Sequence, residues 1–281
     1  MKLPITDPLA ETLGIYVDEV APEYAVLRTD STTAQYNAFG FAHGGFLYTL
    51  GHIAARNMGV LCLNRHMQVV QANSLYLRKV FGSPITARAS LLTDYGHTVV
   101  CLVEIMDAKG EICFRQTLTM QETMRDRVTL SEPKQPPVAD GWHDRTAAFD
   151  RRKQEAPYFD EICHITAPEQ NGDMVICRTD LYADTVSDAG YVHQGVLYTC
   201  SDNCAAACVA MLQKKQPITI TSTVNYLAPA TIGPVTAVGR VIREGRDQSF
   251  YCIDVYDGFG KPIVTSQFVM QCVPFAGPMP V

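Results

Sequence analysis

The chain carries one seven-residue stretch twice, as HGGFLYT at residues 43–49 and as HQGVLYT at residues 193–199. The same shift of 150 residues aligns other short segments: RTD at 28–30 with 178–180, YL at 76–77 with 226–227, and TA at 86–87 with 236–237. A repeat of this length is a domain and not a solenoid unit. We therefore predict two fused domains of one kind, so the differences between the two copies carry information about function.

Composition limits the classes of protein to consider. A chain of 281 residues has room for two domains of about 120–150 residues each. A net charge of −6 argues against a nucleic-acid partner, because such surfaces are usually basic. We find no run of about 18 apolar residues and no apolar signal core at the start, so we expect no membrane span and a cytoplasmic location.

Both copies predict the same order of elements: an extended segment, a polar loop, one long apolar helix and four strands. The helices are expected at residues 45–61 and 195–212, after extended segments at 23–30 and 173–180. The strands are expected at 68–77, 85–94, 98–106 and 112–119, and at 218–227, 235–243, 249–256 and 263–269. DAKG at 107–110 and DGFG at 257–260 read as hairpin turns. Helices this apolar can be buried only if the sheet wraps around them.

A proline-rich, charged stretch at about 122–156 separates the copies. It contains Trp142, the one tryptophan, which we expect to fix part of the linker to the surface. The predicted division is domain 1 at 1–125, a linker at 126–155 and domain 2 at 156–281.

Three of the ten cysteines, Cys200, Cys204 and Cys208, recur at helical spacing. A metal site is the alternative to core packing, but no histidine stands at ligand spacing beside them. Free cysteine in a reducing compartment behaves as a small core residue, so we favour packing and expect no metal.

Each long helix starts with a histidine and a glycine, as His43-Gly44-Gly45 and as His193-Gln194-Gly195. Free N–H groups and the positive end of the helix dipole would favour a developing oxyanion there. The alternative is that Gly44 and Gly45 only permit tight helix packing.

Nine residues after each histidine stands a polar residue, His52 in the first copy and Asp202 in the second. Aspartate is costly inside an apolar helix, which indicates a functional site unless the side chain is exposed. Nine helical residues span about 13.5 Å and about 180° of rotation, so His193 and Asp202 cannot share one small site. Groups of both kinds can meet only if they come from two different helices.

The pattern Asn37-x-x-Gly40-x-x-His43-Gly44-Gly45 resembles the signature of hotdog-fold acyl-CoA thioesterases of the phenylacetate-pathway type. In that family an acidic residue follows the histidine by nine positions, where Asp202 stands after His193. The stretch VNYLAP at 224–229 is similar to the family's strand after the helix. The resemblance implies an α+β double hotdog, in which two tandem hotdog domains each wrap an antiparallel sheet around a long helix.

The family builds its site across a dimer interface, which implies two unequal sites in this chain. One would combine Asp202 with Asn37, His43, Gly44 and Gly45. The other would combine His52 with Ser187, His193, Gln194 and Gly195, and it lacks both the carboxylate and the asparagine. The resemblance therefore implies one active and one degenerate site.

The implied reaction is hydrolysis of an acyl-CoA thioester, with CoA as part of the substrate and no separate cofactor. Asp202 would act as general base or as nucleophile, Gly44 and Gly45 would hold the thioester oxygen, Asn37 would orient the carbonyl or the water, and His43 would support the loop. Thr219 or Thr221 would hold the water. Arg78, Lys79 and Arg243 are candidates for the CoA phosphates, against the alternative of solvated strand ends.

Two rival functions remain open on the sequence. One is a hotdog hydratase or dehydratase that acts on acyl-CoA. The other is an acyl-CoA-binding module without catalysis. The acyl chain and the pairing of two chains into a homodimer also stay open.

Overall fold

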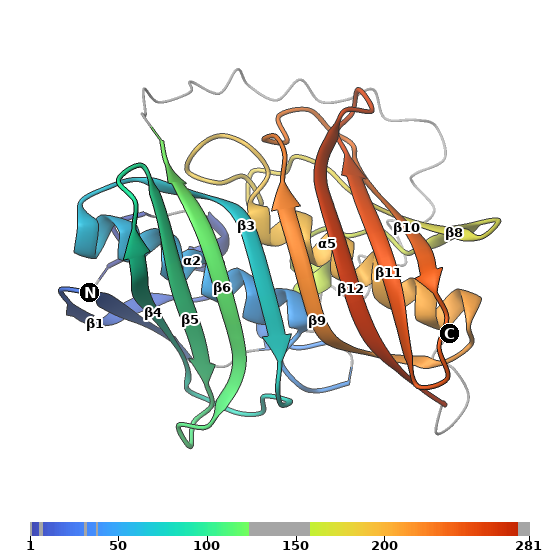
Figure 1. Cartoon of the computed structure of the whole chain (residues 1–281), viewed down its shortest axis with the longest axis horizontal. Coiled ribbons are helices and arrows are strands. Elements are labelled where there is room, and N and C mark those ends of the chain that lie inside the picture. Colours follow the sequence, from blue (N-terminus) through green and yellow to red (C-terminus); the bar gives the residue numbers. More distant parts are fainter. Residues whose placement is uncertain (1, 6–7, 31–32, 38, 124–157, 275–281) are drawn as a thin grey trace.

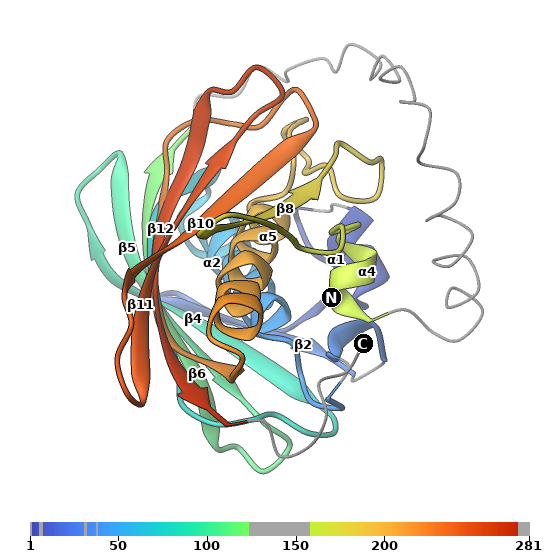
Figure 2. The same ribbon diagram turned by 90° about the vertical axis from the view of Figure 1, so that its right-hand side faces the viewer.

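The computed structural model describes residues 2–5, 8–30, 33–37, 39–123 and 158–274. Within them, one antiparallel sheet of twelve strands curves around two long helices (Figures 1 and 2). Helix α2 spans Gly44–Leu63, and α5 spans Gln194–Ala207 and continues as a π-helical turn over Cys208–Leu212. The short α1 (Pro8–Thr12) and α4 (Phe159–Ile162) lie on the side of these helices away from the sheet (Figure 2).

The strands of the second half mirror those of the first about the centre of the sheet. The first half contains β1 (Tyr16–Ala21), β2 (Tyr24–Thr29), β3 (Met67–Tyr76), β4 (Ile85–Asp94), β5 (Thr98–Met106) and β6 (Ile112–Glu122). The second contains β7 (Glu169–Asn171), β8 (Met174–Thr179), β9 (Gln216–Tyr226), β10 (Val235–Arg243), β11 (Gln248–Tyr256) and β12 (Pro262–Val273). The order is β1-β2-β4-β5-β6-β3-β9-β12-β11-β10-β8-β7, so corresponding strands stand at equal distances from the β3–β9 junction.

The junction has the register of a twofold axis. Asn73 on β3 pairs with Thr223 on β9, which is the residue 150 positions later. Their side chains are joined by a hydrogen bond of 3.0 Å from Thr223 Oγ1 to Asn73 Oδ1. Gln71 and Asn225 are also paired and bonded at 3.0 Å. Because a residue faces its own counterpart, the two sheet halves run in opposite directions through this point.

The two long helices cross with the same symmetry and at very short range. The rings of Tyr48 and Tyr198, again 150 positions apart, stack with centroids 3.6 Å apart and planes within 2°. A Cβ added at Gly195 would lie 2.3 Å from the hydroxyl oxygen of Thr49, and one at Gly45 would lie 2.3 Å from that of Thr199. Gly45 and Gly195 therefore have the packing role that the sequence left open for the glycines at the helix start.

The predicted elements are confirmed, with small changes at their ends. All eight predicted strands are present, and β4, β5 and β10 have the predicted bounds. The hairpin turns close as expected, with Gly110 and Gly260 at positive φ and Asp107 and Asp257 accepting backbone N–H bonds. The sequence missed β1, β7, α1 and α4, which are short or expose most of their side chains. Trp142 and the whole predicted linker at 126–155 lie outside the described residues.

The cysteine stripe packs in the core, as predicted. Cys200, Cys204 and Cys208 are fully buried. Gly239 on β10 makes room for them, because a Cβ there would lie under 3 Å from the sulfurs of both Cys204 and Cys208.

One segment differs from the expectation for membrane spans. Gln194–Leu212 is long and apolar enough, by length and composition, to cross a bilayer. However, 72% of its most apolar window is buried inside the protein. The wrapped sheet accounts for this apolarity, because a helix enclosed on most of its faces needs apolar side chains all round.

We predict that Gly195→Ala lowers the free energy of unfolding by about 1–3 kcal/mol, because the new methyl group overlaps the Thr49 side chain. The better helix propensity of alanine, about 1 kcal/mol, does not compensate. Thr49→Ala removes the overlapping atoms, and the Thr49 hydroxyl is buried without a hydrogen-bond partner among the described residues. Urea denaturation of both single variants and the double variant should therefore show that the second change recovers most of the loss. Additive losses would contradict the packing role.

Candidate active site

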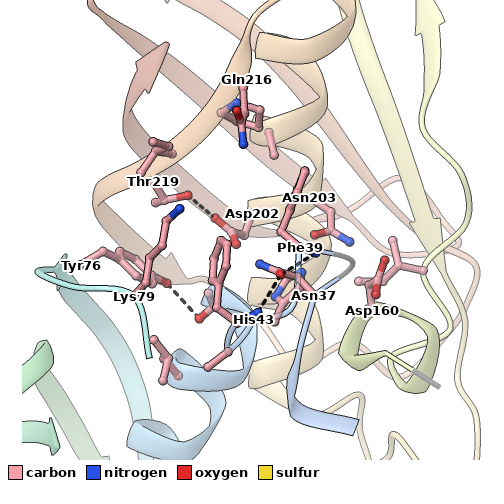
Figure 3. Close-up of a pocket in the computed structure, with 18 of the residues that line it drawn as sticks. Asn37, Phe39, His43, Tyr76, Lys79, Asp160, Asp202, Asn203, Gln216 and Thr219 are labelled. Atoms are coloured by element: carbon pink, nitrogen blue, oxygen red, sulfur yellow. Dashed lines mark hydrogen bonds between the residues drawn. The ribbon is translucent and has the colours of Figure 1, made fainter. Parts of the chain in front are cut away.

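A pocket of about 580 Å³ lies where the two halves of the chain meet (Figure 3). The first half contributes the loop around Asn37, the start of α2 and the end of β3. The second half contributes α4, the middle of α5 and the start of β9. Asn37, His43, Gly44, Asp202 and Thr219 all line this pocket, so the structure brings together residues that the sequence grouped from two separate copies.

Asp202 is buried at the pocket wall, with 6% of its surface exposed. Its Oδ1 accepts a hydrogen bond of 2.9 Å from Thr219 Oγ1. Its Oδ2 faces Gly44 so closely that a Cβ on Gly44 would lie 2.9 Å away. Burial raises the pKa of Asp202, and the nearby His43 and the Thr219 hydrogen bond partly oppose this rise. The carboxylate thus has one oxygen held and the other directed at the start of α2.

The structure separates the two threonines that were candidates for holding water. Thr219 and Thr221 would share a face of a regular strand, but β9 has an irregular register at Ile220, between the pairs Met270–Thr219 and Val269–Thr221. Thr219 lines the pocket and bonds Asp202, whereas Thr221 pairs with Leu75 across the β3–β9 junction and is not part of the lining. Of the two candidates, only Thr219 belongs to this group.

The two glycine amides at the start of α2 have different positions in the hydrogen-bond network. His43 is the N-cap, and its Nδ1 accepts the N–H of Gly45 at 2.9 Å. The Gly45 N–H is therefore occupied, which corrects the expectation that it holds a substrate oxygen. Among the described residues nothing accepts a hydrogen bond from Gly44 N–H, which belongs to the first residue of α2. Gly44 supplies the free amide of this helix end.

Asn37 closes its loop with one side-chain atom and leaves the other available. Its Oδ1 accepts a hydrogen bond from Phe39 N at 3.0 Å. In the second half, the Ser187 hydroxyl does the same for Ala189 N at 3.3 Å. Replacing serine with asparagine therefore keeps the turn and adds an amide Nδ2 donor, for which no described residue is an acceptor.

The three cationic candidates are split by the fold. Arg78 lines the pocket and pairs with Glu111, and Lys79 lines it with its Nζ 4.7 Å from the centre of the Phe41 ring. Arg243 is at the end of β10, paired with Phe250 of β11, and is not part of the lining. Four positions in strand order separate β10 from β3, so the expectation for Arg243 does not fit this pocket.

The equivalent place in the other half is filled by side chains. Gln194, the counterpart of Gly44, accepts a 2.7 Å bond from His52 Nε2 and donates a 2.8 Å bond to the carbonyl of Val69. Arg56, the counterpart of Ala206, is buried and forms an ion pair of 2.9 Å with Asp188. We call the group formed by Gln194, His52, Val69, Arg56 and Asp188 the counterpart site.

Side-chain size explains why only one of the two places is hollow. Three further residues in the pocket wall are smaller or more polar than their counterparts: Cys177 stands for Leu27, Asn203 for Ile53 and Pro217 for Met67. Together with Gly44 and Ala206, they leave open the volume that Gln194, Arg56 and the larger apolar side chains occupy in the other half.

The sequence did not identify every residue of the pocket. Tyr76 lines it and donates a 3.1 Å hydrogen bond to the carbonyl of Gly44. The signal was available, because Tyr76 is repeated as Tyr226. Asp160 and Asn203 also line the pocket, but their spacing gives no sign that α4 and α5 meet there. Among the described residues no group of three or more His, Cys, Asp or Glu side chains is placed to bind a metal.

Comparison with known proteins adds family and fold. The model of the thioesterase superfamily matches residues 189–263, which include α5 and its N-cap histidine. A protein named "Putative esterase PM0788", from Pasteurella multocida, is 30% identical over 98 residues, which cover 34% of this chain and 69% of that protein.

Solved structures resemble the chain over almost its whole length. A conserved protein with a hot dog fold from Alicyclobacillus acidocaldarius covers 99% of this chain and is itself covered completely, with a TM-score of 0.61 and 14% identity. An acyl-CoA thioesterase II from Mycobacterium marinum gives 96% and 100% coverage, a TM-score of 0.60 and 15% identity. These likenesses establish the hotdog fold, and with the sequence matches they show that the chain belongs to the thioesterase superfamily.

Proposed function

We propose that the protein hydrolyses acyl-CoA thioesters at one composite site, the pocket between two tandem hotdog domains. The observation that carries the proposal is the close approach of the buried Asp202 carboxylate of one half to Gly44 of the other, a residue whose N–H has no acceptor among the described residues. A base or nucleophile and an oxyanion donor on opposite sides of a small space are the two groups that acyl transfer requires. Membership of the thioesterase superfamily supports the same chemistry.

In this proposal the thioester carbonyl oxygen accepts the Gly44 N–H at the positive end of α2. Asp202 Oδ2 then either removes a proton from an attacking water or attacks the carbonyl carbon itself, while Thr219 holds Oδ1. In both routes the carbonyl oxygen becomes an oxyanion in the tetrahedral intermediate, which collapses to expel the CoA thiolate. In the first route the product is the free acid, and the proton that Asp202 took from water passes to the thiolate. In the second route the product is an acyl–Asp202 anhydride, which a water molecule then cleaves to the acid and the free Asp202 carboxylate. Asn37 Nδ2 is the second donor that faces the reacting group.

Charge orients the substrate along the pocket. Arg78 and Lys79 line the pocket beside the end of β3, and Asp160 and Glu161 line it from α4. Figure 3 shows Lys79 and Asp160 on opposite sides of the pocket. The CoA phosphates are attracted to the cations and repelled by the carboxylates. The acyl group therefore lies toward α4 and the small residues Cys177 and Ala206.

The counterpart site takes no part in this reaction. Its Gln194 side chain bonds His52 in the space where a thioester would have to lie, and Arg56 and Asp188 fill the region of the acyl group. We therefore assign one active site to each chain.

We predict that Asp202→Asn lowers kcat by about 10²–10⁴, the usual range for losing a general base. The matched change His52→Asn, at the equivalent position of the other helix, should leave kcat within about twofold because that site is closed. Release of free thiol from short, medium, long and aromatic acyl-CoAs measures both variants and reveals the acyl preference. If the wild-type protein released no thiol from any of them, hydrolysis would be the wrong function.

The acid limb of the pH profile should follow Asp202. Only the ionised carboxylate can act, and burial raises its pKa. We expect kcat/KM to fall as the pH decreases through an apparent pKa above about 3.9, the value of a free aspartate. A profile measured with wild type and Thr219→Ala checks the assignment, because losing the Thr219 hydrogen bond to the ionised form should move the limb to higher pH. An unmoved limb would assign it to another group.

The same carboxylate should cost stability at neutral pH. Its pKa is higher in the folded than in the unfolded chain, so its contribution to stability decreases as the pH rises through the unfolded and then the folded value. We expect Asp202→Asn to unfold at a higher temperature than wild type at pH 7–8, with the difference shrinking toward pH 4. Melting curves across this range test the prediction, and a variant that is less stable than wild type at pH 8 would contradict it.

A further inference from the structure

A row of three hydroxyl groups leads from the core of the second half to the active-site glycine of the first. Tyr76 Oη is 3.1 Å from the Gly44 carbonyl oxygen and 2.7 Å from Tyr198 Oη. Tyr198 Oη is in turn 2.9 Å from Ser222 Oγ. Tyr198 and Ser222 are almost completely buried, and Tyr76 is partly buried at the pocket wall.

The direction of this row follows from counting protons. A carbonyl oxygen only accepts, so Tyr76 gives its single hydroxyl proton to Gly44. Tyr198 must then donate to Tyr76, and Ser222 must donate to Tyr198. Hydrogen bonds aligned in this way polarise one another, so the last donor in the row is strengthened.

The other end of the same peptide unit is also held. The Gly44 carbonyl and the Gly45 N–H belong to one peptide group, and the N–H donates to His43 Nδ1 at 2.9 Å. Tyr76 and His43 therefore fix both sides of the Gly44–Gly45 peptide plane. Glycine has more backbone freedom than any other residue, and Gly44 has no side chain to anchor it. Its own N–H belongs to the preceding His43–Gly44 peptide, whose carbonyl accepts a 3.1 Å bond from Leu47 N–H, so the two peptide planes that meet at Gly44 are each held.

There is no space at position 44 for a residue with a side chain. A Cβ there would lie 2.9 Å from Asp202 Oδ2 on one side and 3.3 Å from Tyr76 Cε1 on another. A larger residue would have to displace either the carboxylate or the tyrosine ring. The pocket thus requires glycine at this position.

The counterpart site supplies an internal comparison. The Tyr226 hydroxyl donates to the Gln194 carbonyl at 3.0 Å, and Tyr48 Oη lies 2.9 Å from Tyr226 Oη. This row stops there, because the counterpart of Ser222 is Ala72, which has no hydroxyl. The extra donor exists only in the row that ends at the open pocket.

We propose that Tyr76 is a positioning residue for the reaction: its hydroxyl, supported by Tyr198 and Ser222 from the other half, holds the Gly44–Gly45 peptide and so helps to keep Gly44 in the conformation in which its N–H is directed at the thioester oxygen. The proposal rests on the proposed thioesterase function. Tyr76 acts through Gly44, so removing its hydroxyl should slow turnover more than it weakens substrate binding.

The test compares Tyr76→Phe with its matched control Tyr226→Phe, which loses the same type of bond at the closed counterpart site. We expect kcat to fall about fivefold to tenfold in Tyr76→Phe, with KM within twofold of wild type, the size of losing one neutral hydrogen bond. Tyr226→Phe should keep kcat within twofold, while both variants lose similar thermal stability. Ser222→Ala, a change that the fold already accommodates at Ala72, should reduce kcat by about twofold to threefold.

A spectroscopic measurement separates positioning from a general loss of packing. A ketone analogue of acyl-CoA, in which CH2 replaces the sulfur, carries the carbonyl but cannot be hydrolysed. The infrared stretch of its ¹³C-labelled carbonyl should shift to lower frequency when bound to wild type, and this shift should be smaller in Tyr76→Phe and unchanged in Tyr226→Phe.

The outcomes distinguish the two proposals. Equal effects of Tyr76→Phe and Tyr226→Phe on kcat, or an unchanged carbonyl shift in Tyr76→Phe, would overturn the positioning role while thiol release by the wild type still supports hydrolysis. If the wild type neither released thiol nor bound the analogue, the proposed function would fall, and the positioning role would fall with it.

Discussion

The close crossing of α2 and α5 is the constraint on which the rest of the structure depends. Gly45 against Thr199 and Gly195 against Thr49 let the backbones approach to a distance that any side chain would prevent, and the Tyr48–Tyr198 stack fills the crossing point. Because Gly44 precedes Gly45 and Asp202 lies one helical turn beyond Thr199, the same contact brings the N-terminus of α2 to the carboxylate in the middle of α5. The geometry proposed for catalysis is thus a consequence of helix packing.

Symmetry produces two such meeting places, and side-chain size makes them unequal. One meeting place has Gln194 and Arg56 turned inward, whereas the other has Gly44 and Ala206 at the equivalent positions, so one place is filled and the other open. The filled place satisfies most of its polar atoms internally, as a buried polar network must to be stable. The open place leaves a carboxylate in an apolar helix with one oxygen bonded to Thr219. Burial without a full set of hydrogen bonds raises the pKa of Asp202, and a carboxyl group with a shifted pKa in a pocket is typical of a functional site.

Much of this could be predicted from the sequence, because the repeat and the hydrophobic periodicity are local signals. They indicated two long core helices and their strands, and comparison of the copies singled out Asp202, while the resemblance to hotdog thioesterases added Asn37. The errors have tertiary causes. Thr221 was separated from Thr219 by an irregularity in β9 at Ile220, which strict alternation does not reveal. The Gly45 N–H was taken by His43, a bond that depends on the cap geometry of α2. Arg243 was placed near the substrate by its position in the chain, but strand order moves β10 away from β3.

The tyrosine pair shows how a catalytic arrangement can grow from a structural one. Tyr76 and Tyr226 make the same bond to the residue after the N-cap histidine, on Gly44 and on Gln194. A bond present in both halves, including the half without a pocket, stabilises the fold first of all. In the open half the same bond acquires a second consequence, because glycine has replaced the side chain that would otherwise have anchored the position. Glycine leaves room for a thioester beside the Gly44 amide, and under our proposal the Tyr76 hydroxyl offsets part of the backbone freedom that glycine brings, so the pocket can be open while the amide stays ordered.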